Sequence, residues 1–338
     1  MLKYGYPQGM RDPGNLPFLT RRPRPGNMNR IYLVIVSQGD DFMKYYTVAF
    51  EGREAVAVSE NGTELYILDG YKDMNALIRS GERPGIPAGK PAVRIGENAD
   101  GSFTGTGPDG TAVRVIAPIP EPLQDVLCLG INYRAHETEA SRFSEEAFGG
   151  EKPKAIFFSK RVNRAPGPGD DIPSYQGLVD SLDYETELGV VIGKDAFQVK
   201  AEDAADYIFG YTIVNDVSAR NLQTAHRQWY FGKSLDGFTP MGPCIMTADE
   251  TAFPPRLRIR CSVNGVPRQD SVTDLLIHGI AEIIETLSVG MTLRAGTVIA
   301  TGTPSGVGMG LQPPVFLNPG DVVRMEIEGI GVLQNTIR

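Results

Sequence analysis

The chain has 338 residues, with 33 Lys and Arg against 41 Asp and Glu, so its formal net charge at pH 7 is −8. This acidic balance argues against a general nucleic-acid binder, which would carry a clustered basic face. No apolar run approaches the roughly 18 residues that a membrane-spanning helix needs. The 39 Gly and 25 Pro predict many turns and argue against a helical bundle or coiled coil. The length allows about two domains.

Cysteine usage and the first thirty residues bear on the compartment. Cys128, Cys244 and Cys261 lie far apart without a CxxC pair, so we expect buried hydrophobic residues in a reducing compartment, not a disulfide or zinc framework. Residues 1–30 contain no apolar block of the kind that a secretory signal needs. We therefore expect a cytoplasmic protein, although the arginines of this segment leave import into an organelle open.

The first part of the chain is expected to be β-rich. Residues 1–29 have the character of an irregular arm, and residues 30–117 that of a small β-rich domain. Turn residues separate its short strand-like runs, which are 31–36, 46–50, 55–58 and 65–68. A short helix is expected over 72–80. The domain boundary is predicted at the proline cluster 117–123, because prolines do not fit inside regular elements.

Residues 118–338 are expected to form a larger catalytic domain, which makes the fold class α+β and mostly β. The clearest strand candidates are 155–158, 187–193, 208–214, 256–263 and 322–328. The dipeptide Asn264-Gly265 predicts a hairpin. Apolar residues from Val272 to Leu287 recur at i, i+3, i+4 and i+7, which predicts one amphipathic helix with a structural His278 on it.

Two acidic residues stand two positions apart at the entrance of a strand. Glu185 and Glu187 lie in SLDYETELGVVIGK (181–194), and side chains at i and i+2 of a strand share one face. Two carboxylates directed at one place repel each other unless a cation or a proton lies between them. A solvated edge strand is the simpler interpretation. The apolar residues that follow should be buried, however, which favours a metal site.

A third acidic residue, Asp216, follows the apolar strand expected at 208–214. Its simpler role is that of a helix N-cap. If it joins Glu185 and Glu187, the three carboxylates form an all-oxygen site. Such a site suits Mg²⁺, Mn²⁺ or Ca²⁺ and not zinc.

His136 and Glu139 form a candidate acid–base pair in LGINYRAHETEA (129–140). In a helix, residues at i and i+3 share a face, so the carboxylate would orient the imidazole as a general base for water. A surface histidine beside an incidental acid is the simpler alternative. Lys233, flanked by aromatic residues and glycine, either holds an anionic oxygen or snorkels at the surface.

The Gly-rich segment ATGTPSGVGMG (300–310) is expected to bind a carboxylate. It lacks the G-x-G-x-x-G pattern, the following helix and the ribose-binding acid of a dinucleotide-binding loop. A tight loop that offers backbone N–H groups and the Thr303 hydroxyl to a carboxylate fits it better.

Six segments occur in the order found in the fumarylacetoacetate hydrolase superfamily, which the chain resembles from about residue 120 to 338. They are GINYRAHETE, DYETELGVVIGK, GYTIVNDVSARNLQ, GKSLDGFTPMGP, TGTPSGVG and FLNPGDVVRMEIEGIG. The resemblance implies a mixed, rolled β-sheet catalytic domain, a small β-rich N-terminal domain and an active homodimer. It also implies binding of Mg²⁺ or Mn²⁺ and action on 2-oxo or 2,4-dioxo acids.

By position in these motifs, the resemblance implies three groups of site residues. The metal ligands would be Glu185, Glu187 and Asp216. The catalytic residues would be His136, Glu139 and Lys233. The substrate-binding residues would be Thr303, Gln223 and Arg220.

The reaction expected from these features is hydrolysis of the C–C bond of a 2,4-dioxo acid of the acylpyruvate or fumarylpyruvate type. The metal would hold the C1 carboxylate and the C2 oxygen, His136 would activate water, and Lys233 would help to stabilise the enolate. The same site would serve an oxaloacetate decarboxylase, a keto–enol tautomerase or an isomerase of a ring-cleavage dienoate. The tail QPPVFLNPGD (312–321) resembles the tautomerase and decarboxylase branch.

A binding protein with a structural Ca²⁺ is the alternative outside enzymes. It predicts tight Ca²⁺ binding without turnover. Such a protein has no use for His136, Glu139 or Lys233 beside the acidic residues, which weighs against it.

Overall fold

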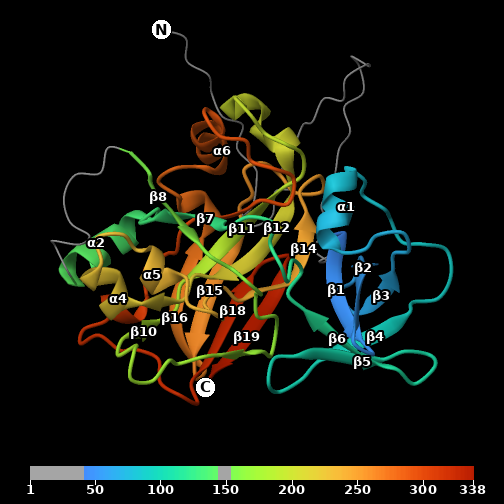
Figure 1. The fold of residues 1–338 in the computed structure, drawn as a ribbon, viewed down its shortest axis with the longest axis horizontal. Helices are drawn as coiled ribbons and strands as arrows, with labels where there is room; N and C mark the ends of the chain where they lie inside the picture. The colour runs from blue at the N-terminus through green and yellow to red at the C-terminus, as the bar shows by residue number, and fades with distance from the viewer. Residues whose placement is uncertain (1–41, 144–153) are drawn as a thin grey trace, which may run out of the picture. The chain divides into compact units, whose positions relative to one another are not determined.

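Short strands dominate the fold, as the apolar runs of the sequence predict (Figure 1). The computed structural model describes residues 42–143 and 154–338. The arm predicted at 1–29 and the strand predicted at 31–36 lie outside these residues. The expected α+β, mostly β fold class is confirmed.

Twelve strands of the described residues form the larger sheet, in the order β2-β3-β4-β5-β6-β1-β14-β12-β11-β17-β7-β8. They are β1 Lys44–Phe50, β2 Arg53–Ser59, β3 Glu64–Ile67, β4 Val93–Glu97, β5 Phe103–Thr106, β6 Ala112–Ile116, β7 Val126–Gly130, β8 Ile156–Lys160, β11 Thr186–Ile192, β12 Ile208–Asn215, β14 Met241–Thr247 and β17 Val298–Ala300. Because β1 pairs with both β2 and β6, strands β1 to β6 close into a ring. The pairing of β1 with β14 joins this ring to the other strands.

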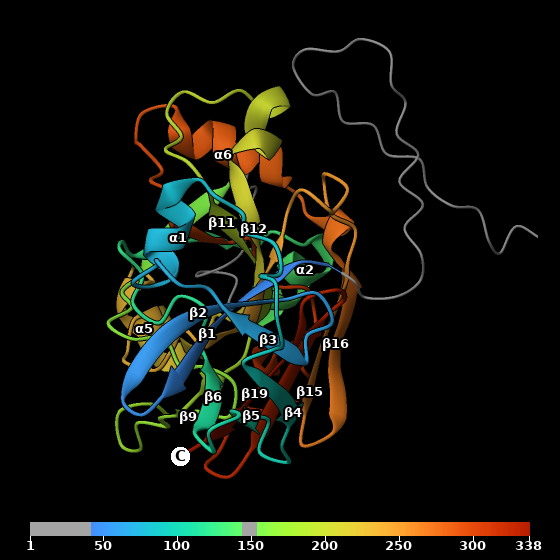
Figure 2. The ribbon, with the colours of Figure 1, turned by 90° about the vertical axis from the view of Figure 1, so that its right-hand side faces the viewer.

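The second sheet has the order β16-β15-β18-β19-β9. Its strands are β9 Asp171–Ile172, β15 Arg258–Val263, β16 Val266–Val272, β18 Val322–Ile327 and β19 Gly331–Ile337, and β10 Leu182–Asp183 pairs separately with β13 Ser218–Ala219. Buried residues alternate along β15 and β18, so one face of this sheet is packed. That face meets the larger sheet, where β14 contacts β19 and β12 contacts β18. Figure 2 shows β15, β16 and β19 running beside one another.

The helices of the described residues are short. They are α1 Met74–Ser80, α2 Arg134–Phe143, α4 Arg220–Ala225, α5 Tyr230–Lys233 and α6 Ile280–Ser288, with the 3₁₀ turns η1 Ala201–Tyr207, η2 Thr273–Leu275 and η3 Gly308–Gly310. The predicted helix at 72–80 is confirmed as α1, which Asp73 caps by accepting a bond from the Ala76 N–H (2.7 Å). None of these helices has the length and apolar character to cross a membrane.

The helix predicted over 272–287 is wrong in its first half, because α6 begins only at Ile280. A longer helix would need the N–H groups of Ile277 and His278 to donate to carbonyls one turn earlier. They donate instead to Asn132, to its carbonyl (2.7 Å) and to its side-chain oxygen (2.8 Å). This long-range contact outweighs the local periodicity. His278 therefore precedes the helix, where its Nδ1 pairs with Glu282 (2.8 Å).

The other expected elements within the described residues lie where the sequence places them. The hairpin at Asn264 and Gly265 joins β15 to β16, and both residues have positive φ, 52° and 75°. The domain boundary at 117–123 stays a prediction. Hydrogen bonds between β1 and β14 cross it.

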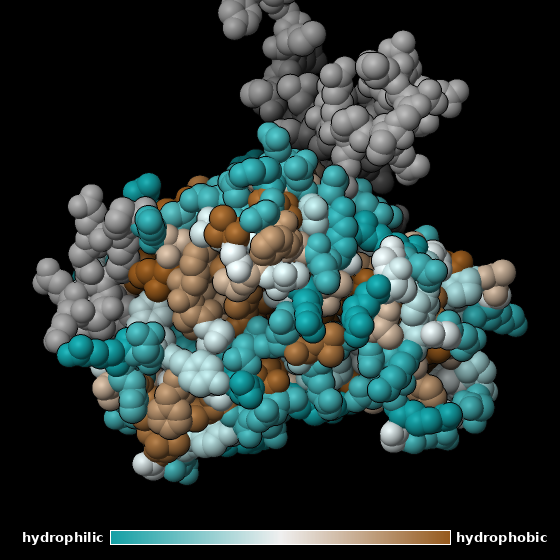
Figure 3. Space-filling model, turned by 45° about the horizontal axis from the view of Figure 1, so that its top comes forward, coloured by the Kyte–Doolittle hydropathy of each residue, from teal (hydrophilic) through white to brown (hydrophobic). Residues whose placement is uncertain are grey.

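Cys128, Cys244 and Cys261 are buried and free, as expected for cysteines that act as hydrophobic residues. They belong to the cores between and beneath the sheets. On the face in Figure 3, hydrophobic residues form small patches among hydrophilic ones. The buried apolar residues of the described part of the chain pack the sheets, and the polar residues that are also buried call for a separate explanation.

Candidate active site

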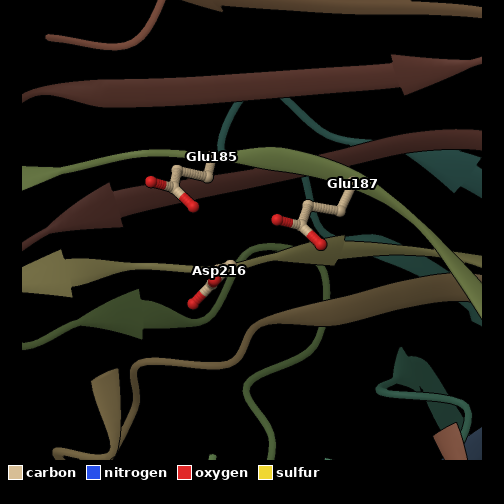
Figure 4. A group of neighbouring side chains, drawn as sticks. All are labelled: Glu185, Glu187 and Asp216. Atoms are coloured by element: carbon tan, nitrogen blue, oxygen red, sulfur yellow. The ribbon is translucent and has the colours of Figure 1, made fainter. Parts of the chain in front are cut away.

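Three buried carboxylates converge at the junction of two central strands (Figure 4). Glu187 lies in β11, Glu185 just before it, and Asp216 just after β12. The register of β11 and β12 pairs Thr186 with Asn215, and the Asp216 N–H donates to the Glu185 carbonyl (2.9 Å). One ligand oxygen of each carboxylate lies within 4.8 Å of the others.

Burial decides between the two interpretations of each acidic residue. Glu185, Glu187 and Asp216 are 5%, 1% and 0% exposed, so the solvated edge strand is wrong. The N-cap interpretation of Asp216 is wrong too, because Ala219 occupies that position of α4. What remains is an oxygen-rich group of ligands inside the protein.

Two of the three carboxylates have fixed cationic partners. The Lys233 Nζ lies 2.9 Å from Glu185 and 2.6 Å from Asp216, and Arg220 lies 2.6 Å from Glu185. Lys160 holds the other oxygen of Asp216 (2.5 Å). Burial opposes ionisation of Glu185, but Lys233 and Arg220 outweigh it and lower its pKa far below the ordinary value. Burial also opposes the charge of Lys233, but Asp216 and Glu185 raise its pKa.

Glu187 differs from the other two carboxylates in its partners, and these partners test whether a cation fits among the three. It accepts one bond from the Gly302 N–H (2.8 Å) and forms no ion pair with a Lys or Arg of the described residues. Burial, followed by Asp216 and Glu185, raises its pKa well above the ordinary value. A divalent cation among the three carboxylates would remove this conflict. The all-oxygen donor set suits a hard cation such as Mg²⁺ or Mn²⁺.

The second cluster is the pair that α2 carries. His136 is 3% exposed, which excludes the surface-histidine interpretation, and its Nδ1 lies 3.5 Å from Glu139. The helical spacing i, i+3 brings the two together as predicted. The N–H of Gly306 donates to both carboxylate oxygens of Glu139 (3.0 Å each), which fixes the acid that faces the imidazole.

The glycine-rich loop at 300–310 gives its N–H groups to carboxylates of the protein itself. Besides the bonds to Glu187 and Glu139, the N–H groups of Gly308 and Met309 donate to Asp183 (2.7 and 3.0 Å). The loop thus connects the acidic ligands with the His136 pair. The Thr303 hydroxyl donates within the protein, to the Thr186 carbonyl (3.0 Å).

One small pocket, partly open to solvent, collects most of the predicted site residues. Those that line it are His136, Lys233, Glu185, Glu187, Thr303, Gln223 and Arg220. The other two stand behind it, Glu139 against His136 and Asp216 within the carboxylate group. Lys233 is 2% exposed, so it does not snorkel.

The side chains of Arg220 and Gln223 form hydrogen bonds and ion pairs with other residues of the site. The Arg220 guanidinium contacts Asp183 (2.8 and 2.9 Å) and Glu185, and it donates to the Gln223 side chain (3.0 Å). Arg220 therefore orients a ligand carboxylate as well as lining the pocket. Whether either residue also contacts substrate stays a prediction.

Two site residues escaped the sequence reasoning, Asp183 and Lys160. Both are fully buried. Asp183 precedes Glu185 by two residues, as Glu185 precedes Glu187. The pattern D-x-E-x-E could therefore have indicated Asp183 as a further acidic residue of the site. Lys160 ends the apolar strand β8 and is joined to Asp216 across 56 positions of the sequence, which no local pattern indicates.

Comparisons with known proteins show what this chain is similar to. Residues 125–338 match the family described as fumarylacetoacetate (FAA) hydrolase C-terminal. The chain is 47% identical over 225 residues to the oxaloacetate tautomerase YisK of Bacillus subtilis, which covers 67% of this chain and 73% of that protein.

Two solved structures are also similar. A fumarylacetoacetate hydrolase from the psychrophilic Exiguobacterium antarcticum has 36% identity and a TM-score of 0.73, covering 88% of this chain and 99% of that one. The fumarylpyruvate hydrolase of Pseudomonas aeruginosa, solved with Mn²⁺ and pyruvate, has 31% identity and a TM-score of 0.55, covering 64% of this chain and 90% of that one.

Proposed function

This chain belongs to the fumarylacetoacetate hydrolase family, and we propose that it is a divalent-metal-dependent enzyme that interconverts the keto and enol forms of oxaloacetate or a similar short 2-oxo acid. The observation that carries the proposal is that Glu185 and Glu187 line one pocket with His136 and Lys233, and that Asp216 completes the carboxylate group just behind it. Such a pocket combines a cation site with a base and an acid. The 47% identity to an oxaloacetate tautomerase supports the choice of substrate.

The carboxylates of Glu185, Glu187 and Asp216 would hold the cation. When bound, it would supply positive charge to the C1 carboxylate and the C2 oxygen of a 2-oxo acid. His136, oriented by Glu139, takes the proton from C3. Lys233, a buried ammonium group beside Glu185 and Asp216, stabilises the negative oxygen at C2, which takes up a proton.

The second candidate is hydrolysis of a 2,4-dioxo acid, the reaction expected from the sequence. His136 takes a proton from water, whose oxygen attacks C4. The C3–C4 bond then breaks, its electron pair remains on the C1–C3 fragment, and C3 takes up a proton. The buried pair of His136 and Glu139 supports this reaction, as does the similarity to the fumarylpyruvate hydrolase.

Product analysis with parallel substrates tests both reactions. The protein is stripped of metal, reloaded with Mg²⁺ or Mn²⁺, and given enol oxaloacetate and acetylpyruvate. We expect accelerated loss of the enol absorbance, with no more CO₂ than in the uncatalysed control. Acetate and pyruvate from acetylpyruvate would instead establish the hydrolase, and CO₂ release a decarboxylase. Absence of all three reactions would contradict an enzyme of 2-oxo acids.

A further inference from the structure

One buried amide joins the loop of residues 301–306 to the strand that carries the acidic ligands. Gln269 is 1% exposed, whereas every other residue of the edge strand β16 is exposed or half-buried. A buried polar side chain costs free energy unless its hydrogen-bonding groups are satisfied. The partners of Gln269 therefore indicate what this side chain does.

The amide of Gln269 makes three hydrogen bonds. Its oxygen accepts from the Thr186 N–H (3.1 Å), and its nitrogen donates to the Thr303 hydroxyl (2.7 Å) and to the Pro304 carbonyl (2.8 Å). The reverse orientation would set nitrogen against the Thr186 N–H and oxygen against the Pro304 carbonyl. Only one orientation satisfies all the partners, so the amide is fixed.

These bonds couple two parts of the site. Thr186 stands between Glu185 and Glu187, and both of its backbone polar groups are bonded here, the N–H to Gln269 and the carbonyl to the Thr303 hydroxyl. Because Thr303 receives one hydrogen bond from Gln269 and donates its only hydroxyl hydrogen to Thr186, its side chain is held in one rotamer.

The loop also lies directly against the backbone of β16. Gly306 has a φ of +103°, and a Cβ at this position would lie 1.9 Å from the carbonyl oxygen of Arg268. Only glycine tolerates this conformation and this approach. The N–H of the same Gly306 holds Glu139. The position of β16 therefore sets both ends of the segment from Thr303 to Gly306.

We propose that Gln269 is a positioning residue, which fixes the loop of residues 301–306 against the ligand strand so that Thr303 keeps its place in the pocket. The proposal deepens the proposed function and rests on it, because Thr303 forms part of the pocket wall that a 2-oxo acid would contact. Gln269 does not line the pocket, so it acts through Thr303.

Amide hydrogen exchange tests the positioning role without any substrate. In the full-length Gln269→Met variant, we expect the amides of Gly302 and Gly306 to exchange about fivefold faster or more, the factor that the net loss of one hydrogen bond gives. Gln334→Met is the matched control. Gln334 is also a buried amide (8% exposed) that bonds a carbonyl, Ala99 (3.1 Å), but it lies in β19 away from the loop. Unchanged exchange in Gln269→Met would overturn the proposal.

Gln269→Glu separates the two contacts of the amide. A glutamate keeps an acceptor for the Thr186 N–H and loses both donations to the loop. If the loop contact matters, Gln269→Glu exchanges as fast as Gln269→Met at Gly302 and Gly306. Wild-type exchange in Gln269→Glu would assign the effect to Thr186 and overturn the proposal.

Kinetics then tests the consequence for the substrate. In the Mg²⁺-loaded Gln269→Met enzyme, we expect the KM for oxaloacetate to rise about 10- to 100-fold and kcat to change much less, because a displaced binding group weakens ground-state binding. An equal KM in both proteins would overturn the inference that Gln269 supports substrate binding through Thr303. If wild type turns over neither oxaloacetate nor acetylpyruvate, the proposed function fails, and the exchange data still decide the role of Gln269.

Discussion

Glu187 differs from the other two carboxylates of the group in what neutralises its charge. Glu185 and Asp216 each contact Lys233 and one further cation, whereas Glu187 has a single backbone N–H. Within the described part of the chain, the site therefore contains one buried carboxylate that no Lys or Arg contacts directly. This imbalance attracts a cation, and it has a cost when no cation is bound.

The first prediction concerns the stability of the metal-free protein. The pKa of Glu187 is higher in the folded state than in the unfolded state. The folded protein therefore binds the proton of the Glu187 carboxyl group more tightly than the unfolded chain does. The resulting stabilisation is present below the ordinary Glu pKa of about 4.3 and is lost as the pH rises through the raised value. At pH 8 in EDTA, Glu187→Gln should therefore be more stable than wild type by about 1–3 kcal/mol.

Urea melts at pH 5 and pH 8 check this prediction. The advantage of Glu187→Gln should be smaller at pH 5, where more of the wild-type carboxyl is protonated. Glu60→Gln, at an exposed position, serves as the control and should show no pH-dependent gain. An advantage of equal size at both pH values would contradict the raised pKa.

The second prediction tests whether His136 acts as a general base and not as a metal ligand. His136→Ala should lower turnover about 10²- to 10⁴-fold, the contribution of a positioned general base, and leave Mn²⁺ affinity nearly unchanged. The matched control is His278→Ala, which removes a second histidine paired with a glutamate, outside the pocket. Calorimetry and steady-state kinetics measure the two effects. Parallel loss of metal binding and turnover would refute the assignment of His136 as a base.

At the scale of elements, the junction of β7 and α2 aims the His136 pair at the pocket. Ile131 follows β7 with a φ of 56°, a conformation in which a β-branched residue is strained. Both Ile131 and the preceding Gly130 line the pocket. Gly130 leaves room for the Trp229 indole, which also meets Phe158 edge-on at 5.4 Å between ring centroids. This contact sets β7 against the segment that leads to Lys233.

The third prediction tests that contact. In Gly130→Ala, the new Cβ would lie 2.2 Å from Trp229, so the indole or the strand must shift. We expect a loss of about 1–3 kcal/mol in the free energy of unfolding. The fluorescence emission maximum of Trp229, the one tryptophan of the chain, should shift as well. Gly85→Ala, with nothing within 4 Å of the added Cβ, should change neither quantity. Unaltered emission in Gly130→Ala would mean that the indole does not pack as described.

At the scale of the molecule, the site joins segments from most of the described chain from β7 onward. Strands β7, β8 and β11, helices α2, α4 and α5, and the loop at 300–310 all contribute to it. A cation bound by residues from separate strands stabilises the folded state and not the unfolded one, because the unfolded chain does not bring these ligands together.

The fourth prediction is that Mg²⁺ or Mn²⁺ raises the Tm of wild type. At a free concentration of 100 Kd, the stabilisation should be about 2.7 kcal/mol, and EDTA should reverse it. Glu187→Gln should show a much smaller increase. Thermal melts across a metal titration measure both. A wild-type Tm that responds to neither metal nor EDTA would contradict a cation site in this group.

Much of the fold and of the candidate site could be predicted, because the relevant information is local. The i, i+2 spacing of Glu185 and Glu187 and the i, i+3 spacing of His136 and Glu139 each determine a shared face once the element is known. Polar contacts between strands that do not pair could not be predicted in this way. Lys160 meets Asp216 over 56 positions and Gln269 meets Thr186 over 83, and only the packing of the folded chain brings them together.

The sequence alone indicated the mostly β class, eight of the nineteen described strands, the pairs that share a face and the family resemblance, since all of these rest on local spacing or on ordered motifs. The tertiary structure decided which polar residues lose their contact with water. Among the described residues, it buried Glu187 without a cationic partner and paired Asp216 with Lys160. Hydrogen bonds to Asn132 prevent α6 from beginning before Ile280. The reason is physical. Burial and long-range hydrogen bonds depend on how strands from distant parts of the chain pair, and the free energy of a buried polar group depends on those partners.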